Sequence, residues 1–303
     1  MPIQYPQFPF SKILGWSISR YEVFDKCKRQ YFYTYYSRYV PDVPQYKLTM
    51  LRDLTSVPLE VGNIVHDVLE RLLRRLQQSD SRIDEEKFLE YADQKAEEYV
   101  SRKTFLEVHY KQYSSIDVNR IKQKVRSSLV NFLESPCFSW LYMKAITNRT
   151  DWMIEPAGYG ETRLSGIKAY CKMDFLFPVG EEIHILDWKT GARDPVKHTA
   201  QLMGYSVAAN SNFGIPWNRI FPKIVYLNPV YDELEISFKE QELEEFFQKI
   251  RAQTDEMCSF CKDVQENIPL QMDSFTPTPS SLCRNCKYQE ICLPKAATPA
   301  ESF

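Results

Sequence analysis

Two short apolar segments constrain the fold of this chain more than any other feature of its sequence. Residues 168–178 contain Asp174, and residues 182–188 lead through Asp187 to Lys189. Both segments are rich in β-branched and aromatic residues and are bounded by proline or glycine, so we predict two neighbouring β-strands. Because side chains alternate along a strand, Asp187 and Lys189 should point to the same face. The sequence therefore predicts two carboxylates and an ammonium group that converge at one sheet edge.

This convergence of charged groups indicates a metal site. Two neighbouring carboxylates that lose contact with water are costly unless a cation lies between them. Carboxylate oxygens suit Mg²⁺ or Mn²⁺, and a nearby lysine can orient water or offset charge on a phosphate. Asp174, Asp187 and Lys189 are therefore the minimal set for metal-assisted hydrolysis of a phosphodiester bond.

The order of the expected elements predicts an α/β fold. Helices are expected over residues 19–36 (with Ser19 as N-cap), 60–78, 84–103, 116–134, 196–210 and 241–266. Strands are expected over residues 152–156, 160–165, 168–178, 182–188, 221–228 and 233–238. We interpret residues 1–303 as a single domain, with residues 80–150 as a helical insertion beside the sheet.

Composition excludes some classes of protein without identifying a function. Hydrophobic residues make up 44% of the chain, which is ample for a core, and no run of apolar residues is long enough to span a membrane. The N-terminus does not resemble a signal peptide, so we expect a cytoplasmic protein with no membrane association. The net charge of −2 does not decide whether the chain binds nucleic acid, because a basic channel can coexist with an acidic remainder.

Three groups of basic residues could follow a phosphate backbone. A solvated helix face explains each group equally well. The groups are Lys26, Lys28 and Arg29; Arg71, Arg74 and Arg75; and Lys122, Lys124 and Arg126.

Two further patterns place polar side chains at helical spacing. Gly62 and His66 stand four residues apart near the start of the second expected helix. Gln201 and Tyr205 stand four apart in the helix expected at 196–210, so both side chains lie on one face. Each pattern alone is weak, because a histidine beside an apolar stripe is often a satisfied core residue. In this order, with the two aspartates and the lysine between them, they form a signature.

This signature resembles the PD-(D/E)XK nuclease superfamily, and within it the RecB-like exonucleases. That group includes the nuclease domains of the RecB and AddB helicase–nucleases and CRISPR-associated exonucleases. The segment from Ser17 to Tyr33 also resembles the opening of that group, and the resemblance spans residues 17–293. It implies a restriction-endonuclease-like core, with a mixed central sheet flanked by helices. The second acidic position carries Asp187 where glutamate is commoner.

The resemblance also implies an activity and partners. It predicts a metal-dependent exonuclease that acts on DNA, either single-stranded or with free ends. A helicase, or CRISPR or phage-defence proteins, would be its partners. The alternative is a DNA-binding or end-processing subunit of such an assembly.

Roles for individual residues follow from the resemblance and from their chemistry. The cation would be held by the carboxylates of Asp174 and Asp187, the carbonyl of Trp188 and the imidazole of His66. A nitrogen ligand favours Mn²⁺ somewhat over Mg²⁺. Lys189 would orient the attacking water, and Gln201 and Tyr205 would contact the scissile phosphate or an adjacent nucleotide.

The chain has eight cysteines and no apparent secretory signal, which favours metal ligation over disulfides. Cys137 and Cys171 stand singly among apolar residues and are expected to be buried. By resemblance, a cysteine-rich tail at residues 277–303 closes on the N-terminal segment 17–36. The implied ligands of its [4Fe–4S] cluster are Cys27, Cys283, Cys286 and Cys292.

A zinc site is the competing interpretation of the cysteines. Cys258-x-x-Cys261 and Cys283-x-x-Cys286 together have nearly the spacing of a zinc ribbon. That quartet leaves Cys27 unexplained, and two of its members fall within the helix expected at 241–266. We therefore favour the cluster, with Zn²⁺ as the alternative.

Overall fold

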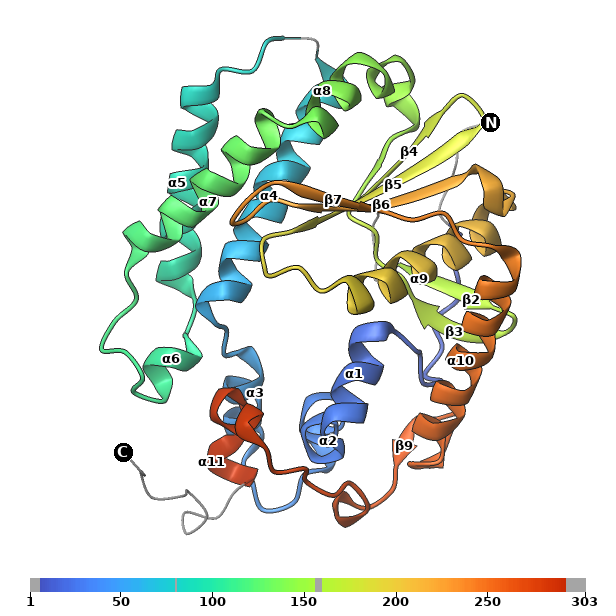
Figure 1. Ribbon diagram of the computed structural model, residues 1–303. Coiled ribbons are helices and arrows are strands. Elements are labelled where there is room, and N and C mark those ends of the chain that lie inside the picture. The colour runs from blue at the N-terminus through green and yellow to red at the C-terminus, as the bar shows by residue number, and fades with distance from the viewer. Residues whose placement is uncertain (1–5, 80, 156–159, 293–303) are drawn as a thin grey trace.

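The computed structural model describes residues 6–79, 81–155 and 160–292, with helices on both sides of a central sheet (Figure 1). The helices are α1 (Ile18–Lys26), α2 (Lys28–Tyr35), α3 (Gln45–Asp53), α4 (Val57–Gln78), α5 (Glu85–Arg102), α6 (Leu106–His109), α7 (Val118–Leu133), α8 (Pro136–Met143), α9 (Pro195–Phe213), α10 (Glu240–Cys258) and α11 (Gln289–Cys292). The strands are β1 (Met153–Ile154), β2 (Glu161–Leu164), β3 (Ile167–Tyr170), β4 (Phe175–Val179), β5 (Glu182–Lys189), β6 (Ile220–Tyr226), β7 (Asp232–Glu235), β8 (Cys261–Asp263) and β9 (Ile268–Pro269). The predicted α/β class is confirmed.

The central sheet mixes parallel and antiparallel strands, as expected. Its order is β1-β4-β5-β6-β7, in which β5 and β6 are parallel and the other neighbours are antiparallel. A parallel pair needs a crossover connection, and α9 provides it between β5 and β6. The register pairs Phe175 with Leu186, so the start of β4 lies beside the end of β5. The two predicted strands that carry the aspartates are therefore neighbours.

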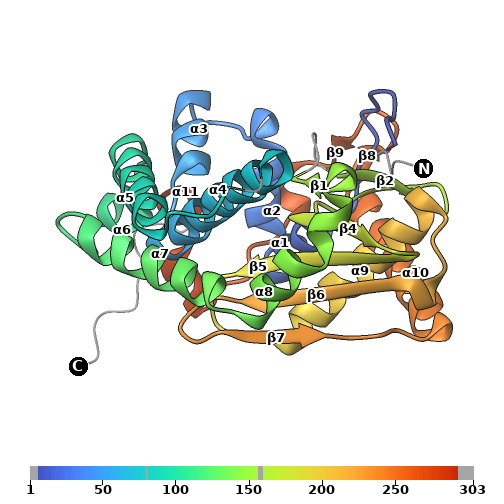
Figure 2. The same cartoon turned by 90° about the horizontal axis from the view of Figure 1, so that it is seen from above.

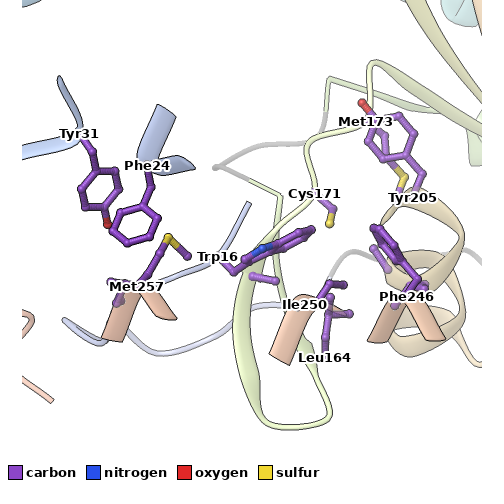
Figure 3. Close-up of a cluster of buried hydrophobic side chains, with 14 of the residues drawn as sticks. Trp16, Phe24, Tyr31, Leu164, Cys171, Met173, Tyr205, Phe246, Ile250 and Met257 are labelled. Carbon is purple, nitrogen blue, oxygen red and sulfur yellow. The ribbon is translucent and has the colours of Figure 1, made fainter. Parts of the chain in front are cut away.

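Side-chain alternation along β5 divides the core into two clusters. Ile183 and Ile185 belong to a cluster with residues of α1, α2, α9 and α10, part of which is drawn in Figure 3. Leu186 and Trp188 belong to a second cluster with residues of α4, α5 and α7. Asp187 therefore faces the same side as Ile185, toward α9.

The helices that follow α4 and precede β1 pack on the face of the sheet that carries Leu186 and Trp188. α5 and α7 lie against α4 and against each other, and Figure 2 shows these three helices together at one end of the molecule. Phe132 of α7 meets the ring of Trp188 edge-on, with 5.1 Å between ring centroids. This helical region therefore supports the strand that carries Asp187.

The continuous helix predicted over residues 19–36 is wrong. Cys27 has extended backbone angles, φ −161° and ψ 107°, and separates α1 from α2. Its sulfur accepts a hydrogen bond from the amide of Gln30 at 3.5 Å, so Cys27 is the N-cap of α2. The N-cap of α1 is Ser17 rather than Ser19. Periodicity did not reveal the break because aromatic residues continue across it.

Two other predicted boundaries need correction. The strand expected over 168–178 is two strands, β3 and β4, which belong to different sheets and are separated by residues 171–174. The helix expected over 241–266 ends at Cys258, and Cys261 begins β8. In both cases an apolar or charged pattern runs across a change of direction that local sequence does not mark. The objection to zinc that Cys258 and Cys261 share one helix is therefore wrong.

The C-terminal tail lies against the N-terminal helices. The ring of Tyr288 packs on Tyr33 of α2 with 5.3 Å between centroids, and Lys287 donates to the carbonyl of Arg52 in α3. Tyr110 donates to the carbonyl of Lys287 at 2.7 Å. Residues 293–303 of the predicted clasp lie outside the described residues. Within the described ranges, every helix is too short or too polar to cross a lipid bilayer.

Candidate active site

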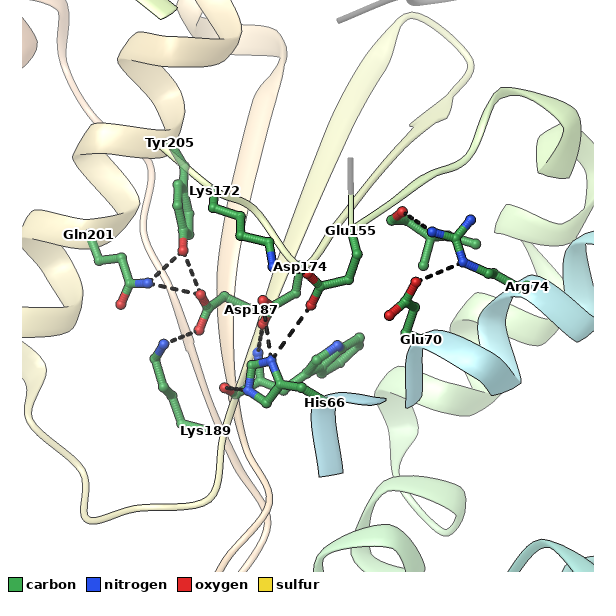
Figure 4. Close-up of polar contacts among 12 residues, drawn as sticks. His66, Glu70, Arg74, Glu155, Lys172, Asp174, Asp187, Lys189, Gln201 and Tyr205 are labelled. Carbon is green, nitrogen blue, oxygen red and sulfur yellow. Dashed lines mark hydrogen bonds and ion pairs between the residues drawn. The ribbon is translucent and has the colours of Figure 1, made fainter. Parts of the chain in front are cut away.

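The two aspartates meet where β4 begins and β5 ends. Asp174 immediately precedes β4, and one of its oxygens accepts a hydrogen bond from the amide of Trp188 at 2.9 Å. Asp174 is 8% exposed and Asp187 is 2% exposed, so both carboxylates are almost out of contact with water. Figure 4 shows them side by side. The convergence predicted from the two strands is therefore present.

His66 approaches the same point from α4. Its Nε2 lies 2.9 Å from the carbonyl oxygen of Trp188, and its Nδ1 lies 3.3 Å from Asp174 Oδ1. Gly62, one turn earlier, faces Thr190, whose hydroxyl would lie 3.4 Å from an added Cβ. An added Cβ would make only an ordinary van der Waals contact there, so the segment that follows β5 passes close to α4 without requiring glycine at position 62.

Asp187 is held by α9 and by Lys189. Gln201 and Tyr205 lie one turn apart on α9, and both donate to Asp187 Oδ1, at 2.9 and 2.5 Å. The ammonium group of Lys189 forms an ion pair with Asp187 Oδ2. The predicted motif residues therefore come together, and Gln201 and Tyr205 donate to a carboxylate while also lining a hollow beside α9.

Burial and mutual repulsion set the charge balance of the site. Burial and the neighbouring charge of Asp174 raise the pKa of Asp187, although Lys189 opposes this. Burial alone would raise the pKa of Asp174, but the charge and hydrogen bond of His66, the charge of Lys189 and the amide of Trp188 together lower that pKa. Burial lowers the pKa of His66, but the carboxylates of Asp174 and Glu155 raise it. The net effect is a raised pKa of about 10. The charged imidazole of His66 thus offsets the negative charge of the neighbouring carboxylates.

Two residues that the sequence did not single out also belong to this cluster. Glu155 follows β1, and its carboxylate lies 3.9 Å from His66 Nδ1. Lys172 lies between β3 and β4 and forms an ion pair with Glu155 at 2.5 Å. The only sequence signal for Glu155 was a single acid at the end of a short apolar run. Its position depends on the pairing of β1 with β4, which local sequence does not reveal.

A hollow on each side of the aspartates opens the site to solvent. The hollow that we call the α9 hollow has a volume of about 620 Å³, and its cations are Arg20, Lys172, Lys189 and Lys197, with Glu22 as its only acid. The α4 hollow has a volume of about 600 Å³ and contains His66, Glu155 and Asp174. Lys172 and Lys189 line both hollows. The α9 hollow is therefore basic, whereas the α4 hollow is rich in potential cation ligands.

Comparison with known proteins agrees with this geometry. The model of the PD-(D/E)XK nuclease superfamily matches residues 15–293. This chain belongs to the PD-(D/E)XK nuclease superfamily. The match includes the five-stranded mixed sheet and all the motif residues around the two aspartates.

More distant comparisons add little to the superfamily assignment. A crystal structure of a candidate exonuclease from Eubacterium rectale resembles the chain with a TM-score of 0.41 and 15% identity, over 88% of this chain and 91% of that one. That similarity is too remote to carry an argument. No curated protein matches the chain at a significant level.

The basic groups expected to guide DNA in this PD-(D/E)XK protein are partly neutralised. Lys28 pairs with Glu256 at 3.0 Å, and Arg126 with Asp93 at 2.8 Å. Arg74 pairs with Glu70. None of the nine predicted basic side chains lines the α9 or the α4 hollow. The solvated-face interpretation fits them better, and Arg20 and Lys197 are basic residues at the site that the prediction missed.

Four cysteines of the PD-(D/E)XK chain surround a separate small hollow of about 60 Å³. They are Cys27, Cys283, Cys286 and Cys292. Burial, with the neighbouring thiols Cys292 and Cys27, raises the pKa of Cys286 to about 11. Among the described residues, the His66–Glu155–Asp174 group has all its ligand atoms within 4.8 Å of one another, and no three of these cysteines do.

The remaining cysteines have other neighbours. Cys258 lies near Cys261, and the hydroxyl of Tyr36 lies 3.6 Å from the sulfur of Cys261. Cys137 and Cys171 are 4% and 5% exposed, so their predicted burial is confirmed. The structure thus groups Cys27 with the three tail cysteines and keeps Cys258 and Cys261 in a separate pair.

Proposed function

We propose that this protein is a divalent-metal-dependent nuclease that hydrolyses DNA phosphodiester bonds, acting as an exonuclease on single strands with free ends. The observation that carries the proposal is the pair of buried carboxylates, Asp174 and Asp187, beside Lys189 at the mouth of a basic hollow. Residues 1–303 would act as one nuclease domain, with residues 80–150 as its helical insertion.

The residues present fit Mg²⁺ or Mn²⁺. Two carboxylates that are more than nine-tenths buried, one of them with its pKa raised by the other, need a positive charge between them. Asp174, Asp187, His66 and the carbonyl of Trp188 offer oxygen and nitrogen donors of the type these ions take. A cation bound there would stabilise charge on a phosphate and make a nearby water more acidic.

The chain's own side chains would position the reacting groups. Gln201 and Tyr205 fix the orientation of Asp187 through its Oδ1. Lys189 is within reach of both hollows and can donate to a phosphate oxygen or to the attacking water, where it offsets developing negative charge. Gln201 and Tyr205 thus act through Asp187, which refines the phosphate contact expected from the sequence.

The α9 hollow supports a single strand as the substrate. Arg20 lines it and can contact backbone phosphates, and Lys197 lines it as well, paired with Glu22 at 2.9 Å. Tyr35 is 40% exposed there, and the guanidinium of Arg20 lies 4.5 Å from the centre of its ring. An exposed ring beside cations is the arrangement on which an unpaired base stacks.

Labelled oligonucleotides test the proposal. The purified chain with Mn²⁺ should shorten a single strand labelled at its 5′ or 3′ end. Asp174→Ala, Asp187→Ala and Lys189→Ala should each lose at least about a hundredfold in rate and still bind DNA. Lys223→Ala is the matched control, because Lys223 pairs with Glu233 and Glu235 on the sheet. If all three variants cleaved DNA at the parental rate, the proposal would be wrong. If the parent protein bound DNA but did not cleave it, a role as a DNA-binding subunit of a helicase or defence assembly would be favoured.

We also propose a [4Fe–4S] cluster on Cys27, Cys283, Cys286 and Cys292. These four sulfurs line one hollow, which supports the set over the zinc ribbon that would use Cys258 and Cys261. Sulfurs around a zinc ion stand only about 3.8 Å apart, given Zn–S bonds of about 2.3 Å. A four-iron core separates its sulfur ligands more widely, and among the described residues no three of these cysteines have their sulfurs within 4.8 Å of one another.

Colour and metal content test the cluster. The protein purified without oxygen should be brown and contain about four irons per chain. Cys27→Ala should lose the iron, whereas Cys258→Ala should keep it. A colourless protein with stoichiometric zinc would end the cluster proposal.

A further inference from the structure

Glu155 is a carboxylate beside Asp174 and His66 to which no motif gives a role. It follows β1 in sequence, and β1 pairs with β4, which places Glu155 beside Asp174 (Figure 4). The backbone amide of Glu155 donates to the carbonyl of Asp174 at 2.8 Å, so the two residues are locked together. The Glu155 side chain is 14% exposed and lines the α4 hollow. Its position is thus fixed by the same strand pair that fixes Asp174.

The spacing around His66 Nδ1 suits a cation better than a hydrogen bond. Nδ1 lies 3.3 Å from Asp174 Oδ1 and 3.9 Å from Glu155 Oε1, and the second distance is too long for a hydrogen bond. Ligands bound at about 2.1 Å to one ion stand about 3.0 Å apart when adjacent and about 4.2 Å when opposite. Both observed distances fall within that range.

The other ring nitrogen of His66 fixes which atom faces the carboxylates. A carbonyl oxygen only accepts, so Nε2 must carry the hydrogen that it donates to Trp188 at 2.9 Å. A metal-binding histidine commonly donates its second N–H to a carbonyl in this way. In the neutral ring, Nδ1 then presents its lone pair to Asp174 and Glu155.

Asp187 has less freedom than Asp174 or Glu155 to bind a cation, because both of its oxygens already have partners. Its Oδ1 accepts from Gln201 and Tyr205, and its Oδ2 contacts the ammonium group of Lys189. Among the described residues, only the trio of His66, Glu155 and Asp174 has its ligand atoms within 4.8 Å of one another.

We propose that Glu155 is a metal ligand, and that His66 Nδ1, Glu155 and Asp174 hold a divalent cation directly. This inference rests on the proposed function and adds a ligand to its site. Lys172 pairs with Glu155 and lines both hollows, so it would be free to contact a substrate phosphate if Glu155 held a cation.

Mn²⁺ binding without DNA tests the inference. The full-length protein is dialysed against chelator and titrated with Mn²⁺ at fixed pH, and free Mn²⁺ is measured by electron paramagnetic resonance. Glu155→Gln should weaken binding about tenfold or more, because even an outer-shell partner of a metal ligand is worth that much. Glu70→Gln should bind as the parent does, since Glu70 lines the same hollow but pairs with Arg74.

A second variant separates a ligand from a structural partner. Lys172→Met keeps Glu155 and removes its ion pair, so it should bind Mn²⁺ at least as tightly as the parent. If Glu155 served only to hold Lys172, the two variants would weaken binding equally, and the inference would be overturned. Parental affinity in Glu155→Gln, with loss in Asp174→Asn, would also overturn it and leave the nuclease proposal standing. Parental affinity in both would remove the nuclease site as well.

Discussion

At the scale of single residues, the site is a balance between carboxylates and the positive charges that face them. Asp174, Asp187 and Lys189 could be placed from the sequence because strand alternation and antiparallel pairing are simple geometric rules. Glu155 and Lys172 could not, because they reach the site from segments next to β1 and β4 whose pairing is non-local. The sequence therefore predicted the motif residues of this strand pair and of the two helices, and missed Glu155 and Lys172.

His66 should give the metal-free protein a distinctive pH dependence. Its pKa is raised from 6.5 to about 10 in the folded protein. The charged imidazole therefore contributes stability that is fully present below pH 6.5 and is lost as the pH rises toward 10. His66→Gln should destabilise the protein most at the acidic end, and the difference should shrink as the pH rises. Urea unfolding in chelator at several pH values measures this, and a constant difference would contradict it.

At the scale of elements, α9 and α7 fix the strand that carries Asp187 from opposite faces. The spacing of Gln201 and Tyr205 in the sequence correctly predicted that both lie on one face of α9. The sequence did not predict that both donate to Asp187 Oδ1, because this contact depends on how α9 crosses the sheet. The break between α1 and α2 at Cys27 was not predicted either, because aromatic residues continue across it.

Tyr205→Phe should loosen the cation site without unfolding it. The change removes one hydrogen bond to Asp187 and keeps the buried ring, so Mn²⁺ affinity should fall about tenfold. Tyr226→Phe is the control, because that hydroxyl bonds to His198 on the same helix and not to Asp187. Calorimetric titration with Mn²⁺ compares them, and equal affinities would show that Tyr205 does not position Asp187.

Phe132→Ala tests the support that α7 gives to β5. Phe132 is fully buried against Trp188, so its loss should cost about 3–5 kcal/mol of unfolding free energy. Phe10→Ala, at a side chain that is 89% exposed, should change stability by less than about 0.5 kcal/mol. Chemical denaturation measures both. A small effect at Phe132 would mean that the helical region contributes little to holding the catalytic strand.

At the scale of the whole molecule, the cysteine-rich tail packs against the N-terminal helices. Cys27 and the three tail cysteines line one hollow, although more than 250 residues separate Cys27 from Cys283. A crosslink across a loop of that length is worth about 5 kcal/mol by the chain-entropy estimate. The cysteine spacing alone left zinc and iron open, because only the fold brings Cys27 to the tail.

Loss of the proposed clasp should expose the tail to proteases. Cys27→Ser should speed tryptic cleavage after Lys287, because only side-chain contacts would then hold that segment on α2 and α3. Cys258→Ser should be cut at the parental rate. Mass spectrometry of a digestion time course measures the difference. Equal rates in the three proteins would argue against a metal clasp at this position.

The central claim is that Asp174 and Asp187 face a common divalent cation, and anomalous X-ray scattering from crystals soaked in Mn²⁺ tests it most directly. The account predicts a strong manganese peak within about 2.5 Å of a carboxylate oxygen of Asp174, in the space bounded by His66 and Asp187. A well-ordered site with no manganese there, or with the ion bound only elsewhere, would contradict it.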